Sequence, residues 1–69
     1  MTLTGAAVLK ILRQAGCVEL RQQGSHVRVQ CDTCHTTVPV HAGETLPAGT
    51  LRKIERDLEP CLGRKWLSR

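Results

Sequence analysis

Apolar and polar residues recur with two different periods along this chain, and the periods divide it into helices and strands. Four apolar residues near the N-terminus follow the i, i+3, i+4, i+7 spacing of one helix face: Val8, Ile11, Leu12 and Ala15. Thr4 precedes them as a good N-cap, and Gly16 follows at the usual helix stop. We therefore predict a first helix over residues 5–15.

Three short segments then alternate with a period of two, as half-buried strands do. The predicted strands span residues 17–22, 26–31 and 36–40, with turns around residues 24–25 and 32–35. The side chains predicted to face the core are Val18, Leu20, Val27, Val29, Cys31, Val38 and Val40. Because Pro39 has no N–H to donate, the third strand should lie at a sheet edge.

A second helix is predicted to begin between Pro47 and Thr50 and to end at Pro60. Its buried stripe consists of Leu51, Ile54 and Leu58. The basic tail over residues 60–69 should hold a short helical turn with Leu62, Trp66 and Leu67. The order of elements predicts one α+β domain over residues 1–69, α-β-β-β-α, in which both helices cover one face of a three-stranded antiparallel sheet.

The turns also predict which residues lie opposite each other in the sheet. We centre the first turn on residues 23–24 and the second on residues 33–34. The expected pairs are Leu20–Val27, Val18–Val29, Glu19–Arg28, Arg21–His26, Val29–Val38, Val27–Val40, Arg28–Pro39 and His26–His41. We therefore expect Arg21, His26 and His41 to form a row on the sheet face that the helices leave uncovered.

The charge balance is basic, with ten Lys and Arg against six Asp and Glu, a net charge of +4. Such an excess suits a nucleic-acid or acidic protein partner, although it also occurs on solvated surfaces without a partner. No apolar run approaches the ~20 residues that span a bilayer. The N-terminus lacks the features of a secretory signal. We expect a cytoplasmic protein that makes no contact with a membrane.

The four cysteines allow several interpretations. Cys31, Cys34 and His35 form a C-x-x-C-H segment, which has ligands for zinc but no second C-x-x-C to complete four. The segment also matches the haem attachment pattern of c-type cytochromes, which requires export that nothing else indicates. The simplest interpretation is a hairpin turn whose thiols oxidise.

Several ordered motifs in this sequence resemble one known family. They are Gln14-Ala15-Gly16, Gly24-Ser25-His26, Val38-Pro39-Val40-His41 and Gly49-Thr50-Leu51-Arg52-Lys53-Ile54. Over residues 4–58 the chain is similar to the HicA toxins (YcfA-like mRNA interferases) of bacterial and archaeal toxin–antitoxin pairs. The resemblance implies a fold like a double-stranded-RNA-binding domain. It also implies a metal-independent, cofactor-free endoribonuclease that cleaves mRNA and is held inactive by a HicB-type antitoxin.

The resemblance further implies that the family's catalytic histidine corresponds to His26. RNA cleavage by the 2′-OH needs a base for that hydroxyl, an acid for the leaving 5′-oxygen, and positive charge near the phosphate. Histidine can take either proton role near neutral pH, so His26 is the expected acid or base and His41 a candidate for the second role. The candidate phosphate-binding residues are Arg21, Ser25, Arg28, Lys10 and Arg13.

Other functions remain open from the residues alone. His26 is equally consistent with a histidine on a strand surface, and His41 with a structural residue at the end of the third strand. Lys10 and Arg13 are equally consistent with the solvent-exposed face of a helix. The chain would then be a non-catalytic RNA-binding module, or a protein whose basic surface only docks an acidic partner. If the protein cleaves RNA and the cleavage is lost when His26 is substituted, the protein is a nuclease and not one of these binding proteins.

Overall fold

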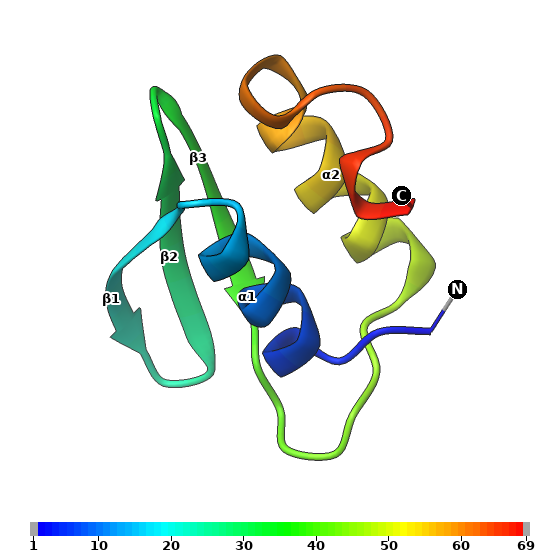
Figure 1. Ribbon diagram of the computed structural model, residues 1–69. Coiled ribbons are helices and arrows are strands. Elements are labelled where there is room, and N and C mark those ends of the chain that lie inside the picture. The colour runs from blue at the N-terminus through cyan, green and yellow to red at the C-terminus, as the bar shows by residue number, and fades with distance from the viewer. Residues whose placement is uncertain (1, 69) are drawn as a thin grey trace.

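The computed structural model describes residues 2–68 and has the predicted α-β-β-β-α order (Figure 1). The helices are α1 (Gly5–Gln14) and α2 (Ala48–Leu62), and the strands are β1 (Val18–Gln23), β2 (His26–Cys31) and β3 (Cys34–Pro39). A short 3-10 helix, η1 (Trp66–Ser68), forms where the sequence predicts a helical turn. The antiparallel sheet has the order β1-β2-β3, and both helices cover one face. We call the other face the open face.

The first helix begins and ends close to the predicted positions. The Thr4 hydroxyl accepts a hydrogen bond from the Ala7 N–H at 3.1 Å, which confirms the predicted N-cap. Gly16 has a φ of 90°, in the left-handed region that glycine favours. The buried residues of α1 are Gly5, Val8, Leu9 and Leu12, while Ile11 is half-buried. The predicted burial of Ala15 is wrong, because this residue is the C-cap, where the chain already turns away toward β1.

The second helix begins in the predicted range and buries the predicted stripe of Leu51, Ile54 and Leu58. Its end differs from the prediction, because Pro60 lies inside α2. A proline in the last turn removes a single backbone hydrogen bond. The turn is held by the Gly63 N–H, which donates to the Glu59 carbonyl at 2.9 Å, and by a disulfide between Cys61 and Cys34. Within residues 2–68 no helix is long and apolar enough to cross a bilayer.

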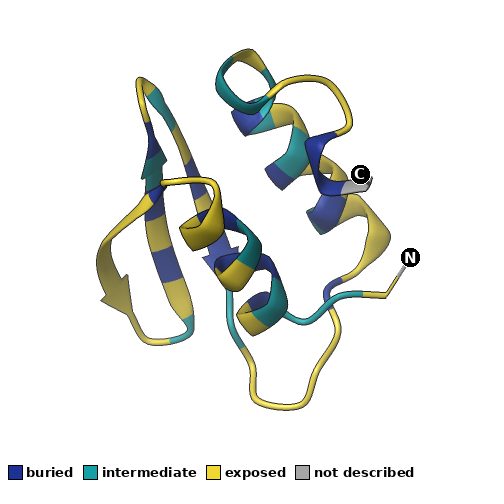
Figure 2. Cartoon of the chain, viewed as in Figure 1, coloured by how far each residue is buried: buried dark blue, intermediate teal, exposed yellow. Residues whose placement is uncertain are grey.

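The core lies between the helices and strands β2 and β3 (Figure 2). The largest fully buried side chains of the described chain are Val8, Leu12, Val29, Thr36, Val38, Ile54 and Leu58. Thr36 is the polar member of this set, and its hydroxyl donates to Asp57 Oδ2 on α2 at 3.1 Å. The hydrogen bond satisfies the buried hydroxyl and joins β3 to α2.

Strand β1 contributes no buried side chain. All six of its residues are exposed, including Val18 at 55% and Leu20 at 49%, so the prediction that these two face the core is wrong. The helices pack against β2 and β3, and β1 lies beside this packed region at the edge of the sheet (Figure 2). Val18 lies opposite Gln30 and so faces the open side of the sheet, and Leu20 is the extra residue of a bulge in the strand.

The pairing of β1 with β2 differs from the prediction for two reasons. The turn lies at Gly24 and Ser25 instead of residues 23–24, and β1 contains a bulge between Glu19 and Arg21. The observed pairs are Val18–Gln30, Glu19–Val29, Arg21–Arg28, Gln22–Val27 and Gln23–His26. Leu20 is the extra residue on the bulged strand. The position of the turn makes the predicted pair Arg21–His26 wrong, and Gln23 takes the place opposite His26.

The pairing of β2 with β3 is displaced by two residues from the prediction. The observed pairs include His26–Pro39, Val27–Val38, Arg28–Thr37, Val29–Thr36, Gln30–His35 and Cys31–Cys34. The turn between these strands is Asp32–Thr33, with Asp32 at a φ of 56°, which aspartate adopts more readily than most residues. A displacement of two residues keeps every side chain on its predicted face. Val38 therefore still faces the core, although the pair His26–His41 is lost.

The four cysteines form two disulfides, Cys17–Cys31 and Cys34–Cys61. The first joins the residue before β1 to the end of β2, and the second joins the start of β3 to the last turn of α2. The bonded residues are 14 and 27 positions apart in the sequence. Cross-links that close loops of this length stabilise a folded chain by about 3–4 kcal/mol each in the chain-entropy account.

Gly5 provides a test of the contact between α1 and β3, because a Cβ at this position would overlap the Pro39 carbonyl oxygen. Gly5→Ala should push α1 away from β3 and lower the free energy of unfolding by about 1–3 kcal/mol. Gly49→Ala is the matched control in α2, since a Cβ there meets nothing within 4 Å. It should leave the stability unchanged or raise it by up to ~1 kcal/mol. Urea unfolding followed by circular dichroism measures both, and equal stabilities of the two variants would contradict this contact.

Candidate active site

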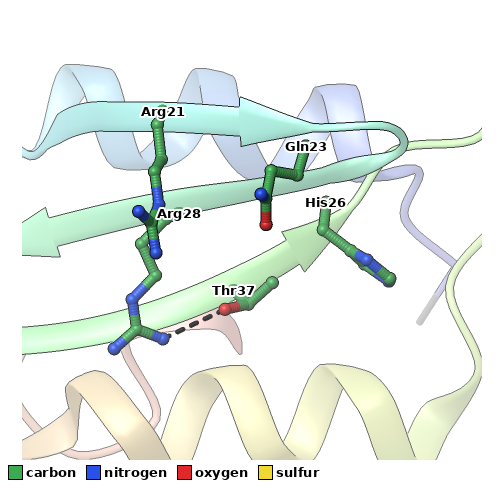
Figure 3. A pocket seen from close by; sticks show the side chains of 5 residues that line it. All are labelled: Arg21, Gln23, His26, Arg28 and Thr37. Carbon is green, nitrogen blue, oxygen red and sulfur yellow. Dashed lines mark hydrogen bonds between the residues drawn. The ribbon is translucent and has the colours of Figure 1, made fainter.

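A small cavity of about 90 Å³ lies on the open face of the sheet (Figure 3). Its lining comes from all three strands and consists of Arg21, Gln23, His26, Arg28 and Thr37. Two of these side chains are guanidinium groups and one is an imidazole, and no carboxylate lines the cavity. The cavity is therefore a basic site that also holds a group able to transfer a proton.

The backbone places His26 at this site. His26 is the first residue of β2 and follows a turn in which Gly24 has a φ of 57°. Val27 is 3% exposed and faces the helices, so the alternation of the strand turns His26 to the open face. This outward direction confirms the sequence prediction. The cross-strand partners of His26 are Gln23 on β1 and Pro39 on β3.

Arg21 and Arg28 lie directly opposite each other on neighbouring strands. Like charges in this position destabilise a sheet by roughly 0.2–1 kcal/mol. Arg28 is oriented by a hydrogen bond from Nη1 to the Thr37 hydroxyl at 3.0 Å (Figure 3). An anion bound between the two guanidinium groups would relieve their repulsion, and the planar fork of arginine suits phosphate oxygens. The pair thus has the properties of a phosphate-binding site beside His26.

The predicted pairing of His26 with His41 is wrong. β3 ends at Pro39, and His41 is exposed in the loop that follows and does not line the cavity. The Val40 N–H donates to the Ser25 carbonyl at 2.6 Å, which fixes the chain at this point. The role of His41 as a second acid or base stays a prediction, without the cross-strand pairing that suggested it.

The other predicted phosphate-binding residues are not brought to the cavity. Ser25 is half-buried in the turn before His26, and it does not line the cavity. Lys10 and Arg13 belong to α1, which lies behind the sheet in the view of Figure 3. Arg13 Nε donates to Glu19 Oε2 at 2.6 Å in an ion pair. The structure therefore groups Arg21 and Arg28 with His26 and leaves these three residues apart.

Gln23 is a lining residue that the sequence interpretation missed. The prediction placed Gln23 in the centre of the first turn, whereas the turn consists of Gly24 and Ser25 and Gln23 is the last residue of β1. A glycine at the first position of a two-residue hairpin turn is a known signal, and it would have indicated this register. The exposed amide of Gln23 lies opposite His26 and offers donors and an acceptor to a bound ligand.

The set Cys31, Cys34 and His35 does not form a metal site in this structure. The two cysteines are bonded to Cys17 and Cys61, and these bonds also occupy the thiols that haem attachment would need. His35 is exposed and lies opposite Gln30 on the open face. With both disulfides formed, no group of three or more His, Cys, Asp or Glu side chains within residues 2–68 could hold a metal ion.

The comparisons with known proteins agree with the resemblance seen in the motifs. The model of one family, described as HicA toxin of bacterial toxin–antitoxin, matches residues 5–59. No curated protein and no solved structure shows significant similarity to the chain, so the likeness to a double-stranded-RNA-binding domain stays a prediction. The matched range contains every residue that lines the cavity and most of the 69 residues. The chain therefore belongs to the HicA toxin family and is the toxin of a bacterial toxin–antitoxin system.

Proposed function

We propose that this toxin is an endoribonuclease that cleaves mRNA, with His26 as a general acid or base and a HicB-type antitoxin as its inhibitor. The observation that supports the proposal most directly is the shared cavity of His26, Arg21 and Arg28. The cavity combines a proton-transfer group with two fixed positive charges on an exposed sheet face. The family match over residues 5–59 supports the proposal that the chain is a toxin, and the resemblance of the Gly24-Ser25-His26 motif implies that His26 is its catalytic histidine.

The chemistry uses the nucleophile that RNA itself carries. A base removes the proton from the 2′-OH, the 2′-oxygen attacks phosphorus, and the bond from phosphorus to the 5′-oxygen breaks as that oxygen takes up a proton. The products are a 2′,3′-cyclic phosphate and a 5′-OH. His26 performs one of the two proton transfers. Arg21 and Arg28 stabilise the additional negative charge on the phosphorane oxygens.

Gln23 and Thr37 have positioning roles in this proposal. The Thr37 hydroxyl accepts a hydrogen bond from Arg28 and so holds one guanidinium group at the cavity wall. Gln23 lies in the cross-strand position opposite His26, where its amide can donate to a phosphate oxygen or accept from a ribose hydroxyl. Held in the right geometry, such groups contribute by fixing the reacting atoms rather than by moving protons.

A HicB-type antitoxin fits the same basic surface. An acidic partner is favoured by the net charge of +4 and by the absence of carboxylates from the cavity lining. Complementary charge speeds association and selects the partner. Both RNA and an acidic protein would be attracted to the open face, which explains how one surface can serve catalysis and inhibition.

His26→Ala should lower the RNA cleavage rate by about 10²–10⁴-fold, the usual loss on removal of a general acid or base. Its free energy of unfolding should stay close to that of the wild type, since the side chain is exposed. The assay uses disulfide-bonded protein, RNA and EDTA, followed by analysis of the fragment ends. Wild-type protein should release fragments that end in 2′,3′-cyclic phosphate.

The matched control for this assay is His41→Ala. Because His41 lies outside the cavity, this variant should retain most of the cleavage rate. A loss as large as that of His26→Ala would instead assign the second proton transfer to His41. Full activity of His26→Ala would refute the proposed role of His26. Binding of RNA by the wild type without any cleavage would identify the protein as a non-catalytic RNA-binding module.

Arg21→Ala and Arg28→Ala should each weaken RNA binding and reduce the slope of log affinity against log salt by about one, because each removes one phosphate contact. Fluorescence anisotropy at several salt concentrations measures this slope, and the His26→Ala background keeps the RNA intact. Lys10→Ala removes a charge of the same sign from α1 and should leave the slope unchanged. Equal changes for Lys10→Ala and Arg28→Ala would show that RNA does not select the cavity.

A further inference from the structure

The four cysteines lie together at the end of the sheet that is far from His26. Cys17 immediately precedes β1, Cys31 ends β2, Cys34 begins β3, and Cys61 lies in the last turn of α2. In Figure 1 the β2–β3 turn and the C-terminal end of α2 lie at the same end of the molecule. His26 is at the opposite end of β2, so the proposed RNA chemistry does not involve this cluster.

The four cysteines are linked by three close pairs, which are Cys17–Cys31, Cys31–Cys34 and Cys34–Cys61. The Cα atoms are 4.4 Å apart in the pair Cys17–Cys31 and 6.2 Å apart in the pair Cys34–Cys61. Cys31 and Cys34 are cross-strand partners at the tip of the β2–β3 hairpin, and the Cα atoms of such partners are ~4.5–5.5 Å apart. Cross-strand partners project to the same face of a sheet, and Cys31 is buried on the helix side. The four sulfur atoms therefore gather on one side of one sheet end.

A cavity of about 340 Å³ adjoins this cluster. Three of the four cysteines, Cys17, Cys31 and Cys61, line it, and Cys34 is bonded to Cys61. Cys17 and Cys31 are 8% and 3% exposed, so the cavity has a largely buried wall of sulfur. The Thr33 hydroxyl lies 3.7 Å from Cys61 Sγ, which shows that the hairpin tip is close to the end of α2.

We propose that these four cysteines, once their disulfides are reduced, bind one Zn²⁺ as a structural site. Structural zinc sites use four ligands in a tetrahedron with Zn–S distances of ~2.3 Å, and four cysteine thiolates are a common set. A turn with the spacing C-x-x-C supplies two ligands in many such sites. Cys31 and Cys34 form this turn here, and Cys17 and Cys61 supply the two ligands that the sequence alone does not place.

The two forms of the cluster exclude each other chemically. Each disulfide accepts two electrons and two protons from a dithiol reductant, which is itself oxidised to a disulfide. The four resulting thiols release four protons as they bind Zn²⁺ as thiolates. Either form joins the same chain segments, so α2 stays attached to the sheet in an oxidising compartment through disulfides and in a reducing one through zinc.

His35 is outside this ligand set, although it completes a C-x-x-C-H segment in the sequence. It follows Cys34 directly, so the alternation of β3 turns it to the open face, where it is exposed opposite Gln30. His35→Ala is therefore a matched control for a change at Cys61, because both residues carry a potential zinc ligand near Cys34.

The test is metal binding by the full-length protein after reduction with a dithiol and anaerobic removal of that reductant. Titration with Co²⁺ should give the visible absorption of a tetrahedral thiolate site at one ion per chain, and added Zn²⁺ should displace the Co²⁺. His35→Ala should bind with wild-type affinity. Cys61→Ser should bind more than ~100-fold more weakly, since the loss of an outer-sphere partner alone lowers affinity 10–100-fold.

A second measurement on the wild type avoids dependence on the folding of a cysteine variant. Bound Zn²⁺ should protect all four cysteines of the reduced protein from alkylation, as counted by mass spectrometry. Protection of fewer than four would overturn the ligand set, and so would equal affinities of Cys61→Ser and wild type. Absence of metal binding by the reduced wild type would overturn the site altogether. None of these measurements uses RNA, so their outcome is independent of the role proposed for His26.

Discussion

The burial of alternate side chains of β2 against the helices is the constraint on which the candidate site depends. Val27 and Val29 are 3% and 1% exposed, and they pack in the core with α1, α2 and β3. Because side chains alternate along a strand, burial of the two valines requires His26 and Arg28 to project from the open face. The core and the cavity are thus two sides of one strand. Any change that turned β2 over would expose the valines and bury a histidine and an arginine, which is strongly unfavourable.

Strand β1 contributes to the cavity rather than to the core, and its bulge makes this possible. If the register continued without interruption from the pair Glu19–Val29, Arg21 would lie opposite Val27 and face the helices. The extra residue in the bulge moves Arg21 to the place opposite Arg28 on the open face. Bulges often redirect a side chain in this way near functional sites. The bulge therefore allows Val18 and Arg21 both to lie on the open face, opposite Gln30 and Arg28.

One end of the sheet carries the disulfides, and the other end carries His26 of the candidate site. A domain of this size buries only about 60% of the surface of its unfolded chain, so its core alone provides a small margin of stability. The end of the sheet near Cys34 carries the cross-links, and the hydrogen bond from Thr36 to Asp57 lies one turn of α2 away from them. The end near His26 carries no disulfide, so its exposed residues are free of any cross-linking role and can serve binding and catalysis. A cysteine cluster that holds either disulfides or zinc would stabilise the end of the sheet near Cys34 under both oxidising and reducing conditions.

The sequence by itself determined the elements, their order and the face of each residue in β2, because these depend on local signals. The cap at Thr4 and the alternation around His26 act within a few residues, and an even displacement of a strand leaves its faces unchanged. Only the tertiary structure decided the register of β2 with β3, which excludes His41 from the cavity, whereas the place of Gln23 opposite His26 follows from the turn at Gly24 and Ser25. Register depends on turn conformation, such as the left-handed backbone of Asp32, and on a bulge that no local pattern marks. The cysteine pairs were also undetermined by sequence, because proximity of residues far apart in the chain arises only when the sheet and helices pack.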